Sequence, residues 1–261
     1  MRLKNKIAVV TGGSQGIGRG VVQVFAEEGA KVVIADIDAE AGENTVKDLI
    51  DKNLDVRFHK TDVSNEEDVK SLIEYTINEF GKLDVLVNNA AINFRKSVHE
   101  TSLEEWNNLM GINLTGPFLC SKYAIPEMQK QDTSSIINMV SWHAETTITR
   151  LAAYASAKGG LTALTRQMAL DYGQHQIRVN AIGPSSVDTP LLHKTFASLE
   201  NPEKSFEESL AFNPMGRVGT VDDIAKACLF LASDDSTYVS GQTILVDGGQ
   251  SNKIARPIEF D

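Results

Sequence analysis

Thr11-Gly12-Gly13-Ser14-Gln15-Gly16-Ile17-Gly18 directly follows a short apolar run and opens a predicted helix. Glycines permit a tight turn and a close approach of the backbone to a ligand. The N-terminus of a helix offers free N–H groups and the positive end of a dipole. A pyrophosphate group is therefore the natural ligand of this turn. Because a glycine cluster is informative only between a strand and a helix, its context decides the interpretation.

Apolar strand segments alternate with amphipathic helical segments along the chain. The predicted strands cover residues 7–11, 31–36, 55–60, 84–88, 135–140, 178–182 and 243–246. The predicted helices cover residues 16–28, 39–52, 66–80, 103–129, 152–172 and 221–231. The first six strand segments are continuously apolar, as in parallel strands that are covered on both faces. This order predicts an α/β fold in which residues 1–261 form a single domain around one doubly wound parallel sheet with helices on both faces.

Three features interrupt this alternation. Pro117 and Pro126 should kink or end the helix 103–129 locally. Residues 183–217 contain four prolines and form a long irregular region with short helical patterns, which is typical of a lid or binding loop. The tail 250–261 either frays or packs across a subunit interface, and its apolar residues favour packing.

Composition excludes several function classes. The formal net charge is −10, which disfavours nucleic acid and anionic membranes as partners. No apolar run approaches the roughly 20 residues that span a bilayer, and the apolar run after Lys6 is too short for a secretion signal. Cys120 and Cys228 lie in apolar helical segments without metal-ligand spacing, so we expect buried thiols and no metal site. We expect a cytoplasmic protein.

The acidic residue that ends the second strand predicts the choice of cofactor. Asp36 lies eighteen residues after Gly18, and a carboxylate here accepts hydrogen bonds from ribose hydroxyls and repels a 2′-phosphate. The sequence therefore favours NAD over NADP. The alternative for Asp36 is a solvated turn residue. Asp62 could similarly accept from adenine, although Asp before Ser-Asn-Glu-Glu also resembles the start of a helix.

Tyr154 and Lys158 lie four residues apart in a predicted helix, so their polar ends share one face. A nearby ammonium group favours the phenolate and lowers the pKa of the tyrosine. The pair could then take a proton from an alcohol or return one to a ketone. Taken alone, the pair is more simply explained as a solvated helix surface.

The glycine turn, Asn88-Asn89-Ala90 and the Tyr154/Lys158 pair, in this order, resemble the short-chain dehydrogenase/reductase family over about residues 4–249. The resemblance implies a Rossmann domain with a seven-stranded parallel sheet, usually in a homotetramer. It also implies hydride transfer between a nicotinamide and an alcohol or carbonyl carbon. In this family the catalytic serine would be Ser141, Tyr154 the acid/base, Lys158 its partner and a ligand of the nicotinamide ribose, and Asn113 a holder of a proton relay.

The same resemblance implies the cofactor contacts. They are Gly12, Ser14, Gln15, Gly16, Ile17, Gly18, Asp36, Ile37, Asp62, Val63, Asn89, Ala90, Ala91, Tyr154, Lys158, Val187 and Thr189. One departure is Ser185, where the family usually has glycine. A serine here could reshape the nicotinamide pocket or move the Val187–Thr189 segment.

The residues expected to face the substrate combine hydrogen-bonding and flat groups. Besides Ser141 and Tyr154 they are Asn93, Phe94, Trp142, His143, Arg150 and His193. This mixture suits a sugar, sugar acid or polyol better than a steroid. His143 is the first candidate for a hydroxyl contact, and its alternative is a structural histidine. Two rival functions stay open: a 3-oxoacyl thioester reductase, which usually takes NADPH, and a non-enzymatic NAD-binding regulator.

Overall fold

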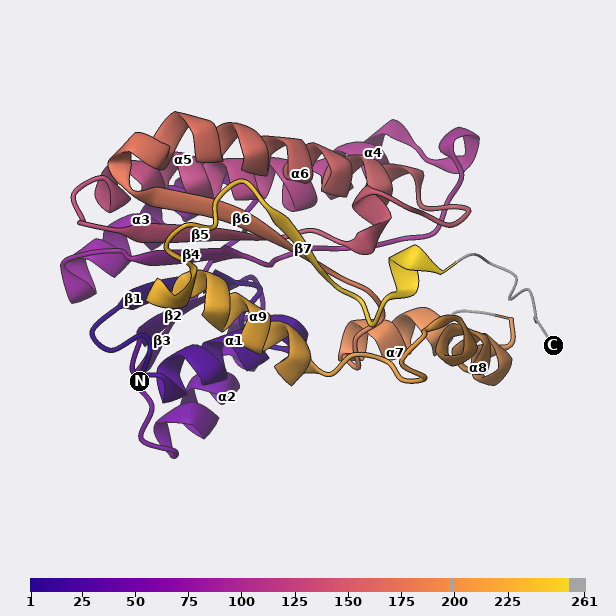
Figure 1. Ribbon diagram of the computed structural model, residues 1–261, viewed down its shortest axis with the longest axis horizontal. Helices are drawn as coiled ribbons and strands as arrows, with labels where there is room; N and C mark the ends of the chain where they lie inside the picture. The colour runs from indigo at the N-terminus through magenta and orange to yellow at the C-terminus, as the bar shows by residue number, and fades with distance from the viewer. Residues whose placement is uncertain (198–199, 254–261) are drawn as a thin grey trace.

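The computed structural model describes residues 1–197 and 200–253, and its strands form one parallel sheet (Figure 1). The strands are β1 (Ile7–Thr11), β2 (Lys31–Asp36), β3 (Val56–Lys60), β4 (Val85–Asn88), β5 (Ser134–Met139), β6 (Ile177–Pro184) and β7 (Thr243–Val246). Their order across the sheet is β3-β2-β1-β4-β5-β6-β7, and all neighbours are parallel. The predicted seven-stranded doubly wound sheet is confirmed. The order reverses between β1 and β4, where such sheets bind ligands.

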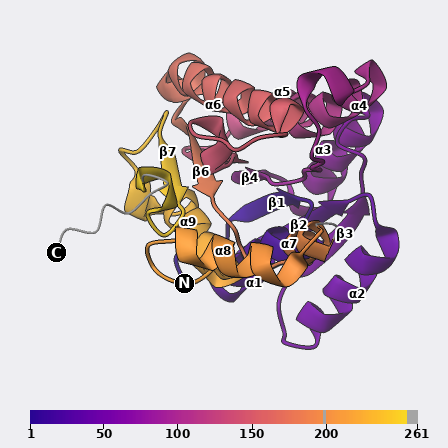
Figure 2. The ribbon, with the colours of Figure 1, turned by 90° about the vertical axis from the view of Figure 1, so that its right-hand side faces the viewer.

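Helices cover both faces of the sheet (Figure 2). They are α1 (Gly16–Glu27), α2 (Ala39–Ile50), α3 (Glu66–Phe80), α4 (Leu103–Met110), α5 (Gly116–Met128), α6 (Ala152–Tyr172), α7 (Pro190–Ala197), α8 (Pro202–Phe212) and α9 (Val221–Ala232). Buried side chains of α1, α2 and α9 form the core on one face, and those of α3, α5 and α6 form the core on the other. The edge strand β3 is only partly buried, unlike the continuously apolar interior strands.

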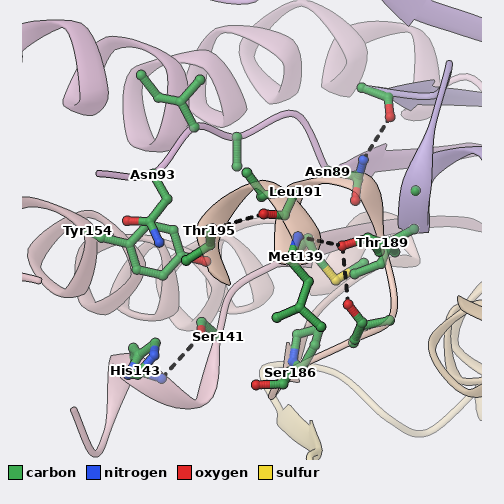
Figure 3. Close-up of a pocket in the computed structure, with 18 of the residues that line it drawn as sticks. Asn89, Asn93, Met139, Ser141, His143, Tyr154, Ser186, Thr189, Leu191 and Thr195 are labelled. Carbon is green, nitrogen blue, oxygen red and sulfur yellow. Dashed lines mark hydrogen bonds between the residues drawn. The ribbon is translucent and has the colours of Figure 1, made fainter. Parts of the chain in front are cut away.

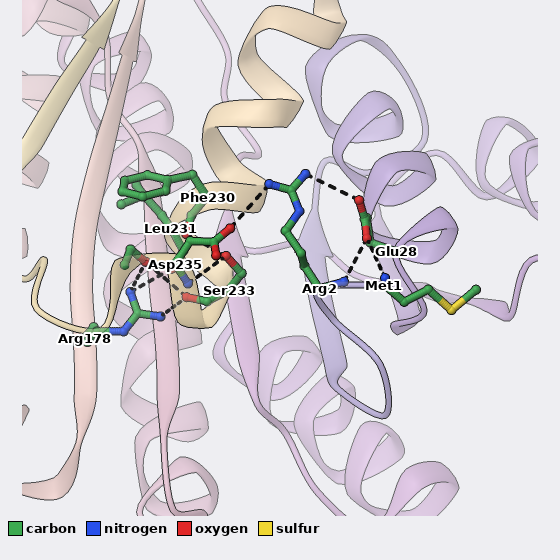
Figure 4. Close-up of polar contacts among 9 residues, drawn as sticks. Met1, Arg2, Glu28, Arg178, Phe230, Leu231, Ser233 and Asp235 are labelled. Carbon is green, nitrogen blue, oxygen red and sulfur yellow. Dashed lines mark hydrogen bonds and ion pairs between the residues drawn. The ribbon is translucent and has the colours of Figure 1, made fainter.

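The start of β6 is tied to the end of α9 by a buried arginine (Figure 4). Arg178 on β6 donates to the carbonyl oxygens of Leu231 at 2.8 Å and Ser233 at 3.2 Å, at the end of α9. A cation at this end complements the helix dipole and satisfies carbonyl groups that have no partner in the helix. At the neighbouring surface, Arg2 contacts both Glu28 and Asp235. These contacts fix α9 against α1, the helix that follows the glycine turn.

The predicted helix 103–129 is helical without a break over residues 103–128. A π-helical turn at Gly111–Thr115 separates its two α-helical parts, α4 and α5, next to Pro117, where a local kink was expected. Pro117 lacks an N–H and cannot donate to the carbonyl of Asn113 four residues earlier, so regular α-helical bonding fails here. Pro126 lies inside α5, which ends two residues later at Met128. π-Helical turns such as Gly111–Thr115 are frequent at functional sites.

The predicted irregular region 183–217 is also more regular than expected. β6 continues to Pro184, and the segment then forms α7 and α8 beyond the carboxyl end of β6 (Figure 1). Pro190 and Pro202 each begin a helix, where a missing N–H has no consequence. The rings of Phe196 and Phe206 meet edge to face at 5.5 Å and hold the two helices together. Within the tail 250–261, a short helical turn covers Gln250–Asn252, and residues 254–261 lie outside the described residues.

Candidate active site

A cavity of about 1150 Å³ lies at the carboxyl edge of the sheet. Most predicted cofactor and catalytic residues line it, although they come from segments far apart in the sequence. They are Gly12, Gln15, Gly16, Ile17, Asp36, Ile37, Asp62, Val63, Asn89, Ala90, Ala91, Ser141, Tyr154, Lys158, Val187 and Thr189. The volume is large enough for a dinucleotide and a small substrate together, since single-ligand sites occupy roughly 300–1,000 Å³.

The glycine turn leaves no room for side chains. Gly12 has a φ of +62°, and a Cβ there would lie 2.9 Å from the Cα of Ala90. A Cβ on Gly18 would lie 2.0 Å from the carbonyl oxygen of Gly12, so this glycine packs the helix onto the turn behind the cavity lining. Asn89 fixes the turn from β4, because its Nδ2 donates to the carbonyl oxygens of Thr11 and Gly12 at 3.0 Å each.

The N-terminus of α1 is available to an anion. Within the described residues, the Gln15 side chain makes no capping hydrogen bond and the first turn of α1 has no acidic residue. By contrast, Asp38, Asn65, Ser102 and Thr220 cap α2, α3, α4 and α9 with their own side chains. The first N–H groups of α1 therefore need an outside acceptor, and a pyrophosphate group would supply it.

Asp36 is held rigidly at the end of β2. Its carboxylate accepts from the N–H of Ser14 at 3.1 Å and from the N–H of Asp38 at 3.2 Å. The Ser14 side chain is buried, and Ser14 is not among the described residues that line the cavity. Its role here is to hold the Asp36 carboxylate through the backbone N–H. Asp62 lines the cavity and also accepts from the N–H and hydroxyl of Ser64. Both interpretations of Asp62, adenine contact and helix-start feature, therefore fit its position.

Ser141, Tyr154 and Lys158 line the cavity where β5 ends against α6. Figure 3 shows Ser141 and Tyr154. Ser141 is buried and accepts a hydrogen bond from the N–H of His143 at 3.2 Å. The Nζ of Lys158 donates to the carbonyl oxygen of Met139 at 2.7 Å and lies 5.6 Å from the centre of the Tyr154 ring. Burial lowers the pKa of Lys158 to about 8.

The pKa of Tyr154 moves against the expectation from the sequence. Burial raises it above its ordinary value, and hydrogen bonding to the Ser141 hydroxyl opposes this rise. Lys158 directs its proton to Met139 rather than to the phenol, so the predicted lowering by Lys158 is not found. At neutral pH Tyr154 is therefore a phenol, which can donate a proton.

Asn113 lies in the π-helical turn, fully buried, with its side chain behind the cavity lining of the described residues. Its Oδ1 accepts from the N–H of Ile92 at 2.9 Å, and its Nδ2 donates to the carbonyl oxygen of Ile92 at 2.9 Å. The side chain thus holds the segment that follows Ala91. Pro117 cannot supply the α-helical hydrogen bond to the carbonyl group of Asn113.

Besides Ser141 and Tyr154, three of the expected substrate-facing residues line the cavity: Asn93, Trp142 and His143. Figure 3 shows Asn93 and His143. The His143 ring stacks against Trp142 at 4.4 Å and meets the Tyr154 ring edge-on at 6.1 Å. Burial lowers the pKa of His143 to about 4, so the ring is neutral at pH 7. Asn93 Oδ1 and His143 Nδ1 are buried without a hydrogen-bond partner among the described residues. Phe94, Arg150 and His193, which we also expected to face the substrate, lie outside the described cavity lining: Arg150 pairs with Glu100, and His193 with Asp188.

Ser185 lies at the end of β6, next to the end of β7. Its hydroxyl donates to the carbonyl oxygen of Asp247 at 3.3 Å and links the ends of β6 and β7. Val187 forms a parallel bridge with Gly219, and the Thr189 hydroxyl accepts from the N–H of Leu192 at the start of α7. Val187 and Thr189 are thereby held beside the cavity.

Several residues that line the cavity were missed by reasoning from the sequence. Arg95 follows Asn93 on the segment after β4, and Gln250 follows β7. Further lining residues come from α7 and α8: Leu191, Lys194, Phe196, Ser205, Glu208 and Phe212. A charged residue just beyond a ligand-binding strand end could have identified Arg95. No local signal identifies the others, because the folding of α7 and α8 over the edge places them there.

Comparisons with known proteins agree with this geometry. Residues 12–251 match a family model described as enoyl-(acyl carrier protein) reductase. The chain is 42% identical to an uncharacterized oxidoreductase of Thermotoga maritima, over 97% of this chain and 98% of the relative. The chain belongs to the short-chain dehydrogenase/reductase family.

Other members of this family resemble the chain over nearly its whole length. The uncharacterized oxidoreductase YxbG of Bacillus subtilis is 42% identical over 95% of this chain and 92% of the relative. The crystal structure of levodione reductase has a TM-score of 0.93 at 33% identity and covers 97% of this chain and 100% of its own. The structure of the aldohexose dehydrogenase of Thermoplasma acidophilum has a TM-score of 0.90 at 33% identity and covers 99% of this chain and 98% of its own.

Family membership makes the protein an oxidoreductase and points to a nicotinamide cofactor. Across residues 1–197 and 200–253, no helix has the length and apolar character to cross a membrane.

Proposed function

We propose that the protein transfers a hydride between NAD and a secondary alcohol or carbonyl carbon of a sugar, sugar acid or polyol. The observation that carries this proposal is the meeting of Ser141, Tyr154 and Lys158 with the glycine turn and Asp36 around one cavity. NAD, when bound, supplies the hydride acceptor. The uncapped N-terminus of α1 and the side-chain-free turn at Gly12 fit its pyrophosphate, and Gln15, Ile17 and Asn89 to Ala91 line its path.

Each catalytic side chain has one task in this proposal. The Ser141 hydroxyl orients the substrate oxygen and stabilises its partial charge. Tyr154 gives a proton to the carbonyl oxygen in reduction and takes one from the hydroxyl in oxidation. Because burial raises the pKa of Tyr154, oxidation should accelerate with rising pH. Lys158 holds the end of β5 against α6 and supplies positive charge beside the phenol.

The choice of NAD over NADP rests on the Asp36 carboxylate. Two backbone N–H groups hold it in place at the end of β2, where a carboxylate would accept from ribose hydroxyls and repel a 2′-phosphate. The exposed Ile37 beside it offers no cation for that phosphate. The same feature disfavours an NADPH-dependent 3-oxoacyl thioester reductase. Retention of Ser141, Tyr154 and Lys158 disfavours a non-enzymatic NAD-binding regulator.

A substrate screen with both cofactors tests this proposal. Aldoses, sugar acids, polyols, cyclic alcohols and steroids are offered with NAD or NADP, and NADH formation is followed by absorbance. We expect turnover of polyhydroxylated compounds with NAD, and Asp36→Asn should reduce the preference for NAD about tenfold or more, since a like charge no longer faces the 2′-phosphate. Turnover confined to hydrophobic alcohols would contradict the substrate class. Preference for NADP in the unaltered enzyme would contradict the cofactor.

We also propose that the protein acts in the cytoplasm as a homotetramer, as is usual in the family. Phe118 on α5 is 48% exposed and Leu170 on α6 is 80% exposed, and α5 and α6 lie side by side on one outer face (Figure 1). Such apolar side chains favour contact with a second copy of the chain. Light scattering after gel filtration should give a tetramer, and Leu170→Asp should give a smaller species. A monomeric unaltered protein would contradict the assembly.

A further inference from the structure

Arg95 is an arginine in the cavity that has no acidic partner in the described part of the chain. It lies on the segment after β4, half-buried, and lines the cavity. Other described arginines hold a carboxylate or carbonyl oxygen: Arg2, Arg19, Arg57, Arg150, Arg178 and Arg217. Arg166 also has no partner in that part of the chain, but it is exposed on α6. A half-buried guanidinium without an anion is unfavourable unless a ligand supplies one.

The position of Arg95 is in the substrate half of the cavity. It is close enough to His143 for its charge to lower the pKa of that ring, and the His143 ring lies 6.1 Å from the Tyr154 ring. The carboxylates Asp36 and Asp62 lie at the ends of β2 and β3, where the adenosine end of the cofactor would bind. The remaining lining carboxylate, Glu208, lies 3.9 Å from Lys204 on its own helix.

Arg95 therefore places a positive charge beside His143 in a protein of net charge −10. Lys194 on α7 adds a second cation to the lining. A negatively charged substrate would be repelled by the molecule as a whole and attracted at this point. The planar guanidinium fork matches a carboxylate with two parallel hydrogen bonds.

We infer that Arg95 binds a carboxylate of the substrate, so that the preferred substrate is a sugar acid rather than a neutral sugar or polyol. This inference rests on the proposed function, because it says which residue binds the end of the same substrate that does not react. The reacting hydroxyl lies at Ser141 and Tyr154, and the carboxylate extends past His143 to Arg95. His143, neutral at pH 7, can accept from or donate to a hydroxyl between the two ends.

Matched pairs of compounds with the same carbon skeleton test the inference. Gluconate is compared with sorbitol, and galacturonate with galactose, by kcat/KM with NAD and by the thermal shift each gives to the NADH-bound enzyme. We expect the acid of each pair to be preferred. Arg95→Gln should lower kcat/KM for the acid roughly 30-fold or more, chiefly through KM, and change the neutral partner less than about threefold. Arg95→Lys should retain part of the preference.

Arg57→Gln is the matched control, since it removes the same charge from the edge strand β3, outside the cavity lining, where its ion pairs with Asp55 and Glu79 are solvent-accessible and contribute little. It should leave both members of each pair unchanged. The inference is overturned if the unaltered enzyme prefers the neutral compound, if Arg95→Gln weakens both members equally, or if it weakens NADH binding instead. Equal thermal shifts by acid and neutral compound overturn it even without turnover. Turnover of neutral sugars alone would overturn the inference while leaving the proposed function intact.

Discussion

At the scale of single residues, burial shapes the active site more than pairing of charges. His143 and Lys158 both lie in the cavity wall, and desolvation lowers the pKa of each, to about 4 and about 8. Tyr154 has its pKa raised by the same cause. All three effects favour the uncharged side chain. In the buried part of the site, burial thus disfavours the charged forms of these side chains.

His143 should make the protein less stable in acid. Its folded-state pKa of about 4 lies below the ordinary 6.5, so between these values the unfolded chain binds the extra proton and stability falls as pH falls. Urea unfolding of the unaltered protein and of His143→Asn at pH 7 and pH 5 tests this. Between these pH values the free energy of unfolding should fall by roughly 1–2 kcal/mol more for the unaltered protein. Parallel pH profiles of the two proteins would show that His143 titrates normally.

At the scale of elements, a buried polar chain fixes α6 against the sheet. Asn88 Nδ2 on β4 donates to Asn138 Oδ1 on β5 at 2.8 Å, and Asn138 Nδ2 donates to Thr165 Oγ1 on α6 at 2.9 Å. Thr165 and Lys158 lie two turns apart on one face of α6, and Lys158 contacts Met139, the residue after Asn138. These two attachments set the position of Tyr154 one turn further along.

Removing the Thr165 hydroxyl tests this attachment. Thr165→Val leaves the shape nearly unchanged but deprives the buried Asn138 amide of its acceptor. We expect a loss of about 1–3 kcal/mol in the free energy of unfolding, measured by chemical denaturation. Thr165→Ser keeps the hydroxyl and should be more stable than Thr165→Val. The reverse order would show that packing of the methyl group, rather than the hydrogen bond, matters here.

At the scale of the whole molecule, the sequence predicted the sheet because each strand carries its own local signal. The apolar runs and the helices between them predicted a doubly wound parallel sheet, and strand ends at Asp36, Asn89 and Ser141 predicted one shared edge. The π-helical turn around Asn113 was not predicted, because it depends on how Pro117 packs rather than on periodicity. Short helical patterns were recognised in 183–217, but the bounds and placement of α7 and α8 were not, since prolines end helices as often as they begin them.

The substrate half of the cavity was predicted least well. Asn93 and His143 were found because they follow strands directly. Arg95 lies two residues beyond Asn93 and carries the same local signal, although it was not singled out. Gln250 and the side chains of α7 and α8 reach the cavity only through the tertiary fold. The pKa of Tyr154 was predicted in the wrong direction because spacing on a helix says nothing about burial.

The central claim is that Tyr154 exchanges the proton that must move with each hydride. The most direct measurement is single-turnover NADH formation by Tyr154→Phe, with Tyr172→Phe at the far end of α6 as the matched control. General acid/base catalysis contributes roughly 10²–10⁴-fold, so Tyr154→Phe should lose at least about 100-fold in rate while binding NADH normally, and Tyr172→Phe should be unaffected. Hydride transfer retained at the original rate by Tyr154→Phe would contradict the account.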